Sequence, residues 1–104
     1  MSGDGESIQE AVRAASEVVQ RCHDMPPAQA KQSFDEALVR MIRARNERLR
    51  KLGAGESARD GELRQVNAIV SLMYSIEFPL GGFHRARLDQ VTQALHSLHE
   101  GAGA

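Results

Sequence analysis

The chain has 104 residues and a formal net charge of −1, with 41% apolar residues but only 4% aromatic ones. This length suits one domain rather than two, and the balanced charge favours neither nucleic acid nor a membrane surface as a partner. The single cysteine, Cys22, excludes an internal disulfide, and no apolar run reaches the roughly 20 residues of a membrane span. The first residues, M-S-G-D-G-E-S, lack the basic and apolar regions of a signal peptide. We therefore expect a soluble cytoplasmic protein with an aliphatic core.

The N-terminal half predicts two amphipathic helices. Ser7 and Glu10 form a capping box in front of the first, which spans residues 8–23 and carries apolar residues on one face. The D-M-P-P that follows ends this helix and presets the backbone for the next. The second helix spans residues 27–52, beginning at the second proline or restarting at Ser33, where S-F-D-E forms another capping box.

The C-terminal half predicts two more helices. The stretch G-A-G-E-S-A-R-D-G is expected to be a loop, and a third helix follows over residues 58–78. Pro79 stops this helix, because the residue before a proline is pushed out of the helical region. The turn P-L-G-G leads into a fourth helix over residues 83–99.

The predicted fold is all-α, a small antiparallel bundle of four helices. Short connections between amphipathic helices favour antiparallel neighbours. We expect a single domain over residues 7–100, with disordered ends at residues 1–6 and 101–104.

Three polar residues fall on the apolar sides of the predicted helices. Arg45 shares its wheel angle with Phe34, Glu77 lies between buried positions of the third helix, and His84 aligns with the inner face of the fourth. Because an unpaired buried charge costs several kcal/mol, roughly, we predict an Arg45–Glu77 ion pair with His84 nearby. Such a cluster is structural, or part of an interface with another chain, or a ligand site in which Glu77 and His84 act as an acid–base pair and Arg45 holds an anion.

The second helix also carries a basic run, V-R-M-I-R-A-R-N-E-R-L-R-K. Arg40, Arg43 and Arg50 are predicted to point outward, where they could neutralise phosphates of nucleic acid. Glu47 interrupts this set, and the aromatic residues that stack on bases are missing. A solvated face with positive charge toward the helix C-terminus explains the run better than nucleic-acid binding does, and a partner with an acidic surface is a further alternative.

Other motifs are weaker. His96 and His99 have a spacing at which a helix can share a metal ion, but two histidines alone do not complete a site. Gly81 and Gly82 lack the spacing and the preceding strand of a phosphate-binding loop. We therefore predict no metal or cofactor, and no catalytic constellation.

From the sequence alone, the favoured function is a protein–protein interaction module, such as a regulator, adaptor or accessory subunit, that forms a homodimer. Arginine, methionine and tyrosine on the second and third helices suit such an interface. The alternatives are nucleic-acid binding through the second helix, and a small-ligand or metal site at the Glu77–His84 corner.

Overall fold

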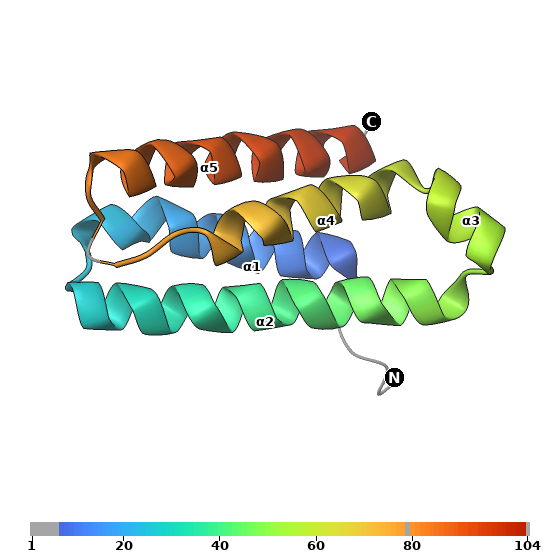
Figure 1. Ribbon diagram of the computed structural model, residues 1–104, viewed down its shortest axis with the longest axis horizontal. Coiled ribbons are helices and arrows are strands. Elements are labelled where there is room, and N and C mark those ends of the chain that lie inside the picture. The colour runs from blue at the N-terminus through green and yellow to red at the C-terminus, as the bar shows by residue number, and fades with distance from the viewer. Residues whose placement is uncertain (1–6, 79, 104) are drawn as a thin grey trace.

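The computed structural model describes residues 7–78 and 80–103, which are almost entirely helical (Figure 1). The four long helices are α1 (Ile8–Arg21), α2 (Pro27–Lys51), α4 (Gly61–Tyr74) and α5 (Gly82–Gly103). A short helix, α3 (Ala54–Arg59), lies between α2 and α4, and a 3₁₀ turn, η1 (Cys22–Asp24), follows α1. The predicted all-α bundle of four helices is confirmed. None of the described helices is both long and apolar enough to cross a membrane.

The long helices pack side by side in an antiparallel bundle. Both α1 and α4 contact α2 and α5, so the order around the bundle is α1, α2, α4, α5. Each helix runs opposite to its two neighbours (Figure 1), the up-down-up-down arrangement that short connections produce. The α1–α2 and α4–α5 turns therefore lie at one end of the bundle, and α3 lies at the other.

Aliphatic side chains from all four long helices fill the centre of the bundle. Phe34 is the one aromatic residue that is fully buried among those described, and no polar or charged side chain in that part of the chain is buried. Alanines fill part of the inner faces of α1 and α2, where small side chains let helices approach closely. The largest fully buried side chains are Phe34, Met41, Ile69, Met73, Leu88, Leu95, Val12, Val19, Val66 and Val91.

The helix starts follow the local signals of the sequence. The predicted capping box is present: the Glu10 backbone N–H donates to Ser7 Oγ at 3.2 Å, and the Ser7 N–H donates to Glu10 Oε1 at 2.9 Å. Helix α2 begins at Pro27, because proline is tolerated at a first helical position. Ser33 lies inside α2, so the alternative restart there does not occur.

The boundaries of the later elements differ from the predicted ones. The predicted loop contains α3, which begins after Gly53, whose N–H donates to Glu56 Oε1 at 2.9 Å. Helix α4 spans residues 61–74 rather than 58–78, because Asp60 caps its start and a tight final turn ends it at Ser75. Helix α5 reaches Gly103, beyond the predicted end at residue 99 and into the predicted tail. The predicted N-terminal tail, residues 1–6, lies outside the described residues.

Asp60 joins the start of α4 to the end of α2. One carboxylate oxygen accepts a hydrogen bond from the Leu63 backbone N–H at 2.9 Å, and the other accepts from Arg48 Nη2 at 2.7 Å and Nε at 3.0 Å. Arg48 Nη1 also lies 3.2 Å from Glu62 Oε1. The Leu63 N–H and then the Arg48 guanidinium lower the pKa of Asp60, and its hydrogen bond and charge partners raise the pKa of Arg48. The pair fixes where α4 begins relative to α2.

Replacing Asp60 with alanine is expected to lower the free energy of unfolding at neutral pH by about 1–2 kcal/mol, the usual cost of losing an N-cap. Asp60→Asn keeps a cap acceptor and loses only the charge, so we expect a smaller loss. Because the pKa of Asp60 is lower in the folded state, its stabilisation is present above the unfolded pKa of about 3.9 and is lost as pH falls through the folded pKa.

Urea unfolding of wild type and Asp60→Ala at neutral and acidic pH checks both points. The exposed Asp89, on the outer side of α5, provides the matched control, because its replacement by alanine should change stability by less than about 0.5 kcal/mol. A wild-type advantage over Asp60→Ala that persists unchanged well below pH 3.9, roughly, would contradict the ionised cap.

Candidate functional site

Arg45, Glu77 and His84 do not form the predicted cluster. The Arg45 guanidinium hydrogen bonds to Asn46 Oδ1 at 3.2 and 3.3 Å and to Asn67 Oδ1 at 3.4 Å. Glu77 is exposed, and Asn67 lies ten residues before it, in the first half of α4. The predicted Arg45–Glu77 ion pair is therefore wrong. The prediction fails because α4 ends early, at Tyr74. Glu77 therefore lies outside the helix and has no position on its helical wheel.

Glu77 and His84 do meet, through the Glu77 backbone rather than its carboxylate. The Glu77 N–H donates to His84 Nδ1 at 3.3 Å, which requires that nitrogen to be unprotonated. The half-buried His84 ring also packs edge-on against Phe83, with centroids 5.3 Å apart. His84 thus holds the α4–α5 turn, and its contact with Glu77 is structural in form.

Arg87 completes the contacts around this turn. Its Nη1 donates to Ser75 Oγ at 2.8 Å, while its guanidinium carbon lies 4.6 Å from the centroid of the Phe83 ring. Ser75 Oγ in turn donates to the Leu72 carbonyl at 2.6 Å, within the last turn of α4. Ser75, His84 and Arg87 therefore form hydrogen bonds within the α4–α5 corner itself.

A small cavity lies between the α1–α2 and α4–α5 turns. Its volume is about 150 Å³, below the roughly 300–1,000 Å³ of ordinary ligand pockets. The buried Cys22 lines it, and burial raises the pKa of this thiol above its usual range. A thiol held in its protonated form is a poor nucleophile. The cavity is lined by Cys22, Met25, Pro27, Ala30, Phe78, Leu80 and Arg85.

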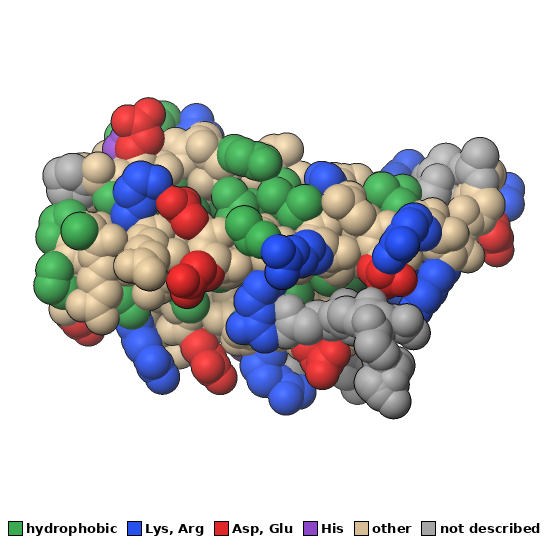
Figure 2. Space-filling model, turned by 90° about the horizontal axis from the view of Figure 1, so that it is seen from below, with side chains coloured by type: hydrophobic (Ala, Val, Ile, Leu, Met, Phe, Trp, Pro, Cys, Tyr) green, Lys and Arg blue, Asp and Glu red, His purple; other side chains and the backbone are tan. Residues whose placement is uncertain are grey.

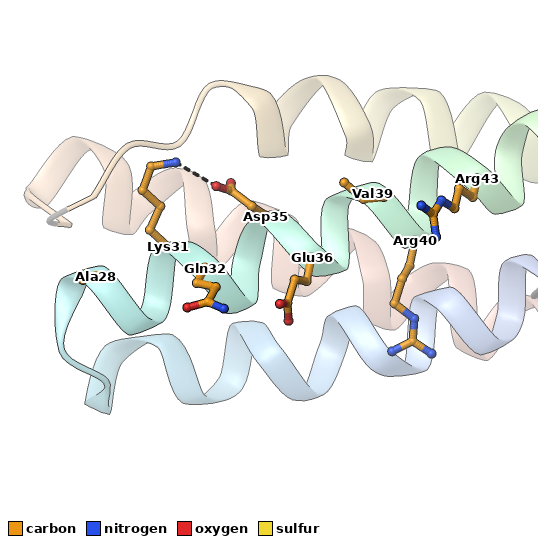
Figure 3. Close-up of a pocket in the computed structure, with 8 residues that line it drawn as sticks. All are labelled: Ala28, Lys31, Gln32, Asp35, Glu36, Val39, Arg40 and Arg43. Atoms are coloured by element: carbon orange, nitrogen blue, oxygen red, sulfur yellow. Dashed lines mark hydrogen bonds and ion pairs between the residues drawn. The ribbon is translucent and has the colours of Figure 1, made fainter.

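A larger hollow, of about 740 Å³, is open to solvent along the outer face of α2 (Figure 3). Every residue that lines it belongs to α2. Val39, with 44% of its surface exposed, stands in the middle of the row, with the acidic residues on one side and arginines on the other. The lining residues are Ala28, Lys31, Gln32, Asp35, Glu36, Val39, Arg40 and Arg43. We call them the α2 outer face.

The arginines considered for nucleic-acid binding are not a continuous positive surface. Arg40 and Arg43 lie on the α2 outer face together with carboxylates one turn earlier, and Arg50 pairs with Glu47. Figure 2, which views the molecule onto α2, shows Lys and Arg side chains interspersed with Asp and Glu. The outward direction of the three arginines agrees with the prediction, since all three are exposed.

An apolar patch borders the α2 outer face where α2 meets α4. Arg45 lies level with Asn67 and Phe34 with Phe78, since each pair is in contact. Because the two helices are antiparallel, Tyr74, which lies seven residues after Asn67, is level with the α2 residue seven before Arg45. That residue directly precedes Val39. Asn67 and Tyr74 also share one side of α4, the side toward α2, because seven residues make about two turns.

The members of this patch, which we call the seam patch, are Val39, Ile42 and Tyr74. Tyr74 is 67% exposed and Val39 44% exposed, while Ile42 is half-buried against the core. Figure 2 shows hydrophobic surface gathered beside α2 among charged side chains. From the sequence, Tyr74 was expected to suit an interface as the tyrosine of the predicted third helix, and Val39 was not identified. The sequence signal that could have identified Val39 is that it is a branched apolar residue outside the buried stripe of its own helix.

The described residues offer no metal centre. No group of three or more His, Cys, Asp or Glu side chains within that part of the chain could hold an ion. His96 is exposed and lines a shallow hollow between α1 and α5. The side chain of His99 lies outside the described residues, so the His96–His99 pair stays a sequence pattern.

No family model matches the chain, no curated protein matches it, and no solved structure matches it. Function therefore has to be inferred from the chain's own residues.

Proposed function

We propose that the chain is a small cytoplasmic protein–protein interaction module, acting as a regulator, adaptor or accessory subunit and able to self-associate. The seam patch supports this proposal. Its Tyr74 leaves two thirds of its surface in water on an otherwise well-packed bundle. Exposed aromatic residues beside arginines are the composition that protein interfaces favour.

The surroundings of the seam patch also resemble an interface. Asp35, Lys31 and Arg43 flank it with charges of both signs, and polar rims of this kind set orientation and specificity. Lys31 Nζ and Asp35 Oδ2 lie 2.7 Å apart, but both side chains are more than half exposed. Such surface pairs contribute little to folding, about 0–1 kcal/mol, so they are free to serve recognition.

The two other candidate functions have less support. A polyanion bound to α2 would lie close to Asp35 and Glu36 as well as to the arginines. Repulsion from the two carboxylates would weaken its binding. A small ligand at the Glu77–His84 corner would have only a cavity of about 150 Å³ nearby, and neither Glu77 nor His84 lines it. Neither surface matches its function as well as the seam patch matches an interface.

Affinity capture with the immobilised full chain tests the proposal. The double variant Val39→Ser, Tyr74→Ser is expected to lose captured partners, or self-association in light scattering, while its melting temperature changes little, since both positions are exposed. The matched control is Phe83→Ser, which removes an equally exposed aromatic residue from the start of α5.

One result would contradict the seam patch as the interface, and another would contradict the interaction module itself. Equal losses with the seam variant and with Phe83→Ser would show that the seam patch is not the interface. Tight binding to DNA or RNA that weakens steeply with salt, and that Arg40→Ala and Arg43→Ala abolish, would assign α2 to nucleic acid instead.

A further inference from the structure

Exposed apolar side chains follow the edge of the bundle where α2 meets α4. The described residues include four large apolar side chains that are exposed, and three of them are Val39, Leu49 and Tyr74. Val39 and Leu49 belong to a row on α2 that continues through Ile42 and Asn46, at steps of three, four and three residues. This spacing keeps the row on one side of the helix for about three turns.

The row lies on the side of α2 that faces α4. Arg45, whose Nη1 donates to Asn67 Oδ1 on α4, marks that side of the helix. Ile42 comes three residues before Arg45 and Leu49 four residues after it, and residues at these spacings are neighbours on a helix surface. The apolar row therefore continues the seam patch toward the end of α2.

A second row runs beside the first, on α4. Its members also recur at steps of three, four and three residues, and all of them are exposed: Arg64, Asn67, Ser71 and Tyr74. Because the helices are antiparallel (Figure 1), Tyr74 lies at the end of the pair where the α2 row has Val39. Arg64 lies at the other end, near the level of Leu49. We call the two rows together the α2–α4 strip.

The charges that flank the apolar row are positive. Arg43 follows Ile42 and Arg45 precedes Asn46, so at 100° per residue one arginine lies on each side of the row. In the heptad notation for paired helices, the row occupies positions a and d, and these two arginines occupy e and g. Within residues 7–78 and 80–103, the side chains of Arg43 and Arg64 form no ion pair.

Carboxylates are scarce along this part of the two helices. Between residues 37 and 51, α2 has one, Glu47, and Arg50 pairs with it. Between residues 63 and 74, α4 has none. Asp60 and Glu62, just before that span, pair with Arg48. Figure 2 shows Lys and Arg side chains next to the hydrophobic surface on the side toward α3. The strip therefore combines an apolar centre with positive edges.

This pattern disfavours a second copy of α2 as the occupant. Paired helices bring position e against g when they are parallel, and e against e and g against g when they are antiparallel. Because Arg43 and Arg45 occupy both positions, either direction sets arginine against arginine. A nucleic-acid backbone also fits poorly, since its phosphates would lie over Val39 and Ile42 while the cations stand at the edges.

On the basis of the proposed interaction function, we infer that the α2–α4 strip binds an amphipathic helix of a partner protein, with acidic residues on both sides of its apolar stripe. The apolar stripe covers the row from Val39 to Leu49, about 15 Å at 1.5 Å per residue. The carboxylates lie beside Arg43, Arg45 and Arg64. An interface of this length is at the small end of the known range, under about 1,200 Å², and its Kd is roughly micromolar.

Two labelled helical peptides of about 20 residues test the charge requirement. Both have leucine at positions a and d, and one has glutamate at e and g where the other has lysine. In fluorescence anisotropy with the full chain, the glutamate peptide should bind with a Kd of roughly micromolar. The lysine peptide should bind at least about tenfold more weakly, the change that 1.4 kcal/mol produces. Binding of the glutamate peptide should also weaken between about 0.1 and about 1 M salt, as the Debye length falls from about 10 to about 3 Å.

Charge reversal on the chain assigns the contact to the α2–α4 strip. The double variant Arg43→Glu, Arg64→Glu should bind the glutamate peptide at least about tenfold more weakly and should bind the lysine peptide more tightly than wild type does. The gain is decisive, because an unfolded variant would bind neither peptide. The matched control is Arg13→Glu, which reverses an exposed charge on the side of α1 toward α5 and should leave both affinities unchanged.

Four results would overturn the inference. A chain that binds neither peptide, or binds both equally, has no preference for an acidic helix. A double variant that binds the glutamate peptide like wild type would place the contact outside the strip. A DNA duplex that binds more tightly than the glutamate peptide and displaces it would assign the strip to nucleic acid.

Capture experiments separate this inference from the proposed function. A captured protein that is lost in Val39→Ser, Tyr74→Ser but retained in Arg43→Glu, Arg64→Glu would overturn the acidic helix and leave the interaction module standing. A chain that captures no protein and binds neither peptide would overturn both.

Discussion

Replacing Phe34 with alanine is expected to lower the free energy of unfolding by about 3–5 kcal/mol, the cost usual for a buried phenylalanine. Only 1% of Phe34 is exposed, and its ring packs edge-on against Phe78 with centroids 5.5 Å apart. It therefore joins α2 to the segment that follows α4. Since a domain of this size is stable by only about 5–15 kcal/mol, the variant should lose a large part of its stability in urea unfolding followed by circular dichroism.

Phe83 is the matched control, because the chain offers a second phenylalanine that is 64% exposed. Its ring contacts His84 and the Arg87 guanidinium, which is worth about 0.5–1 kcal/mol at an exposed site. Phe83→Ala should therefore cost no more than about that amount. If the two alanine variants were equally stable, Phe34 could not be in the core.

Hydrophobic periodicity predicted most of the fold. Phe34, Met41, Val66 and Leu95 all fall on predicted apolar stripes and all are buried. A stripe repeating every 3.6 residues reports which side of a helix avoids water, and short connections then leave few arrangements other than an antiparallel bundle. This information is local, and a single sequence contains it.

The ends of the helices depend on contacts that the sequence does not show. The predicted third helix reached residue 78, but α4 stops at Tyr74, where Arg87 from α5 donates a hydrogen bond to Ser75. Glu77 consequently leaves the helix and becomes exposed. This contact joins residues twelve apart across a turn, and the spacing of apolar residues does not reveal it.

The unequal lengths of α1 and α2 explain why Arg45 is only half-buried, although the sequence placed it on the apolar side of its helix. Helix α2 has 25 residues and α1 has 14, so at 1.5 Å per residue α2 is about 37 Å long and α1 about 21 Å. The last turns of α2 therefore extend past α1. The apolar residue Leu49 is 40% exposed there, and Arg45 reaches Asn67 at the partly open side. A stripe indicates an inner face but not how far a partner helix covers it.

The surface proposed for interaction can be recognised only from the folded structure. Val39 and Tyr74 are far apart in sequence and were not linked by any motif, yet the antiparallel register of α2 and α4 places them at nearly the same level along the bundle.

The close approach of α1 to its neighbours yields the second large effect. Ala15 is 0% exposed on the inner face of α1, where Ala11 and Val12 are also completely buried. A leucine there adds three heavy atoms to a region packed at the density of an organic crystal. Ala15→Leu is therefore expected to lower the free energy of unfolding by about 1–3 kcal/mol, as overpacking does.

The size of the side chain, rather than its hydrophobicity, should decide the result. Ala15→Gly is expected to cost about 1 kcal/mol from helix propensity alone, so alanine should be the best of the three residues. Ala68, exposed on α4, is the matched control: Ala68→Leu should change the stability by less than about 0.5 kcal/mol. Thermal and urea unfolding measure all three changes. A leucine at position 15 that leaves stability unchanged or higher would mean that α1 does not lie against α2 and α5 at this distance, because only close packing makes three additional carbons unfavourable.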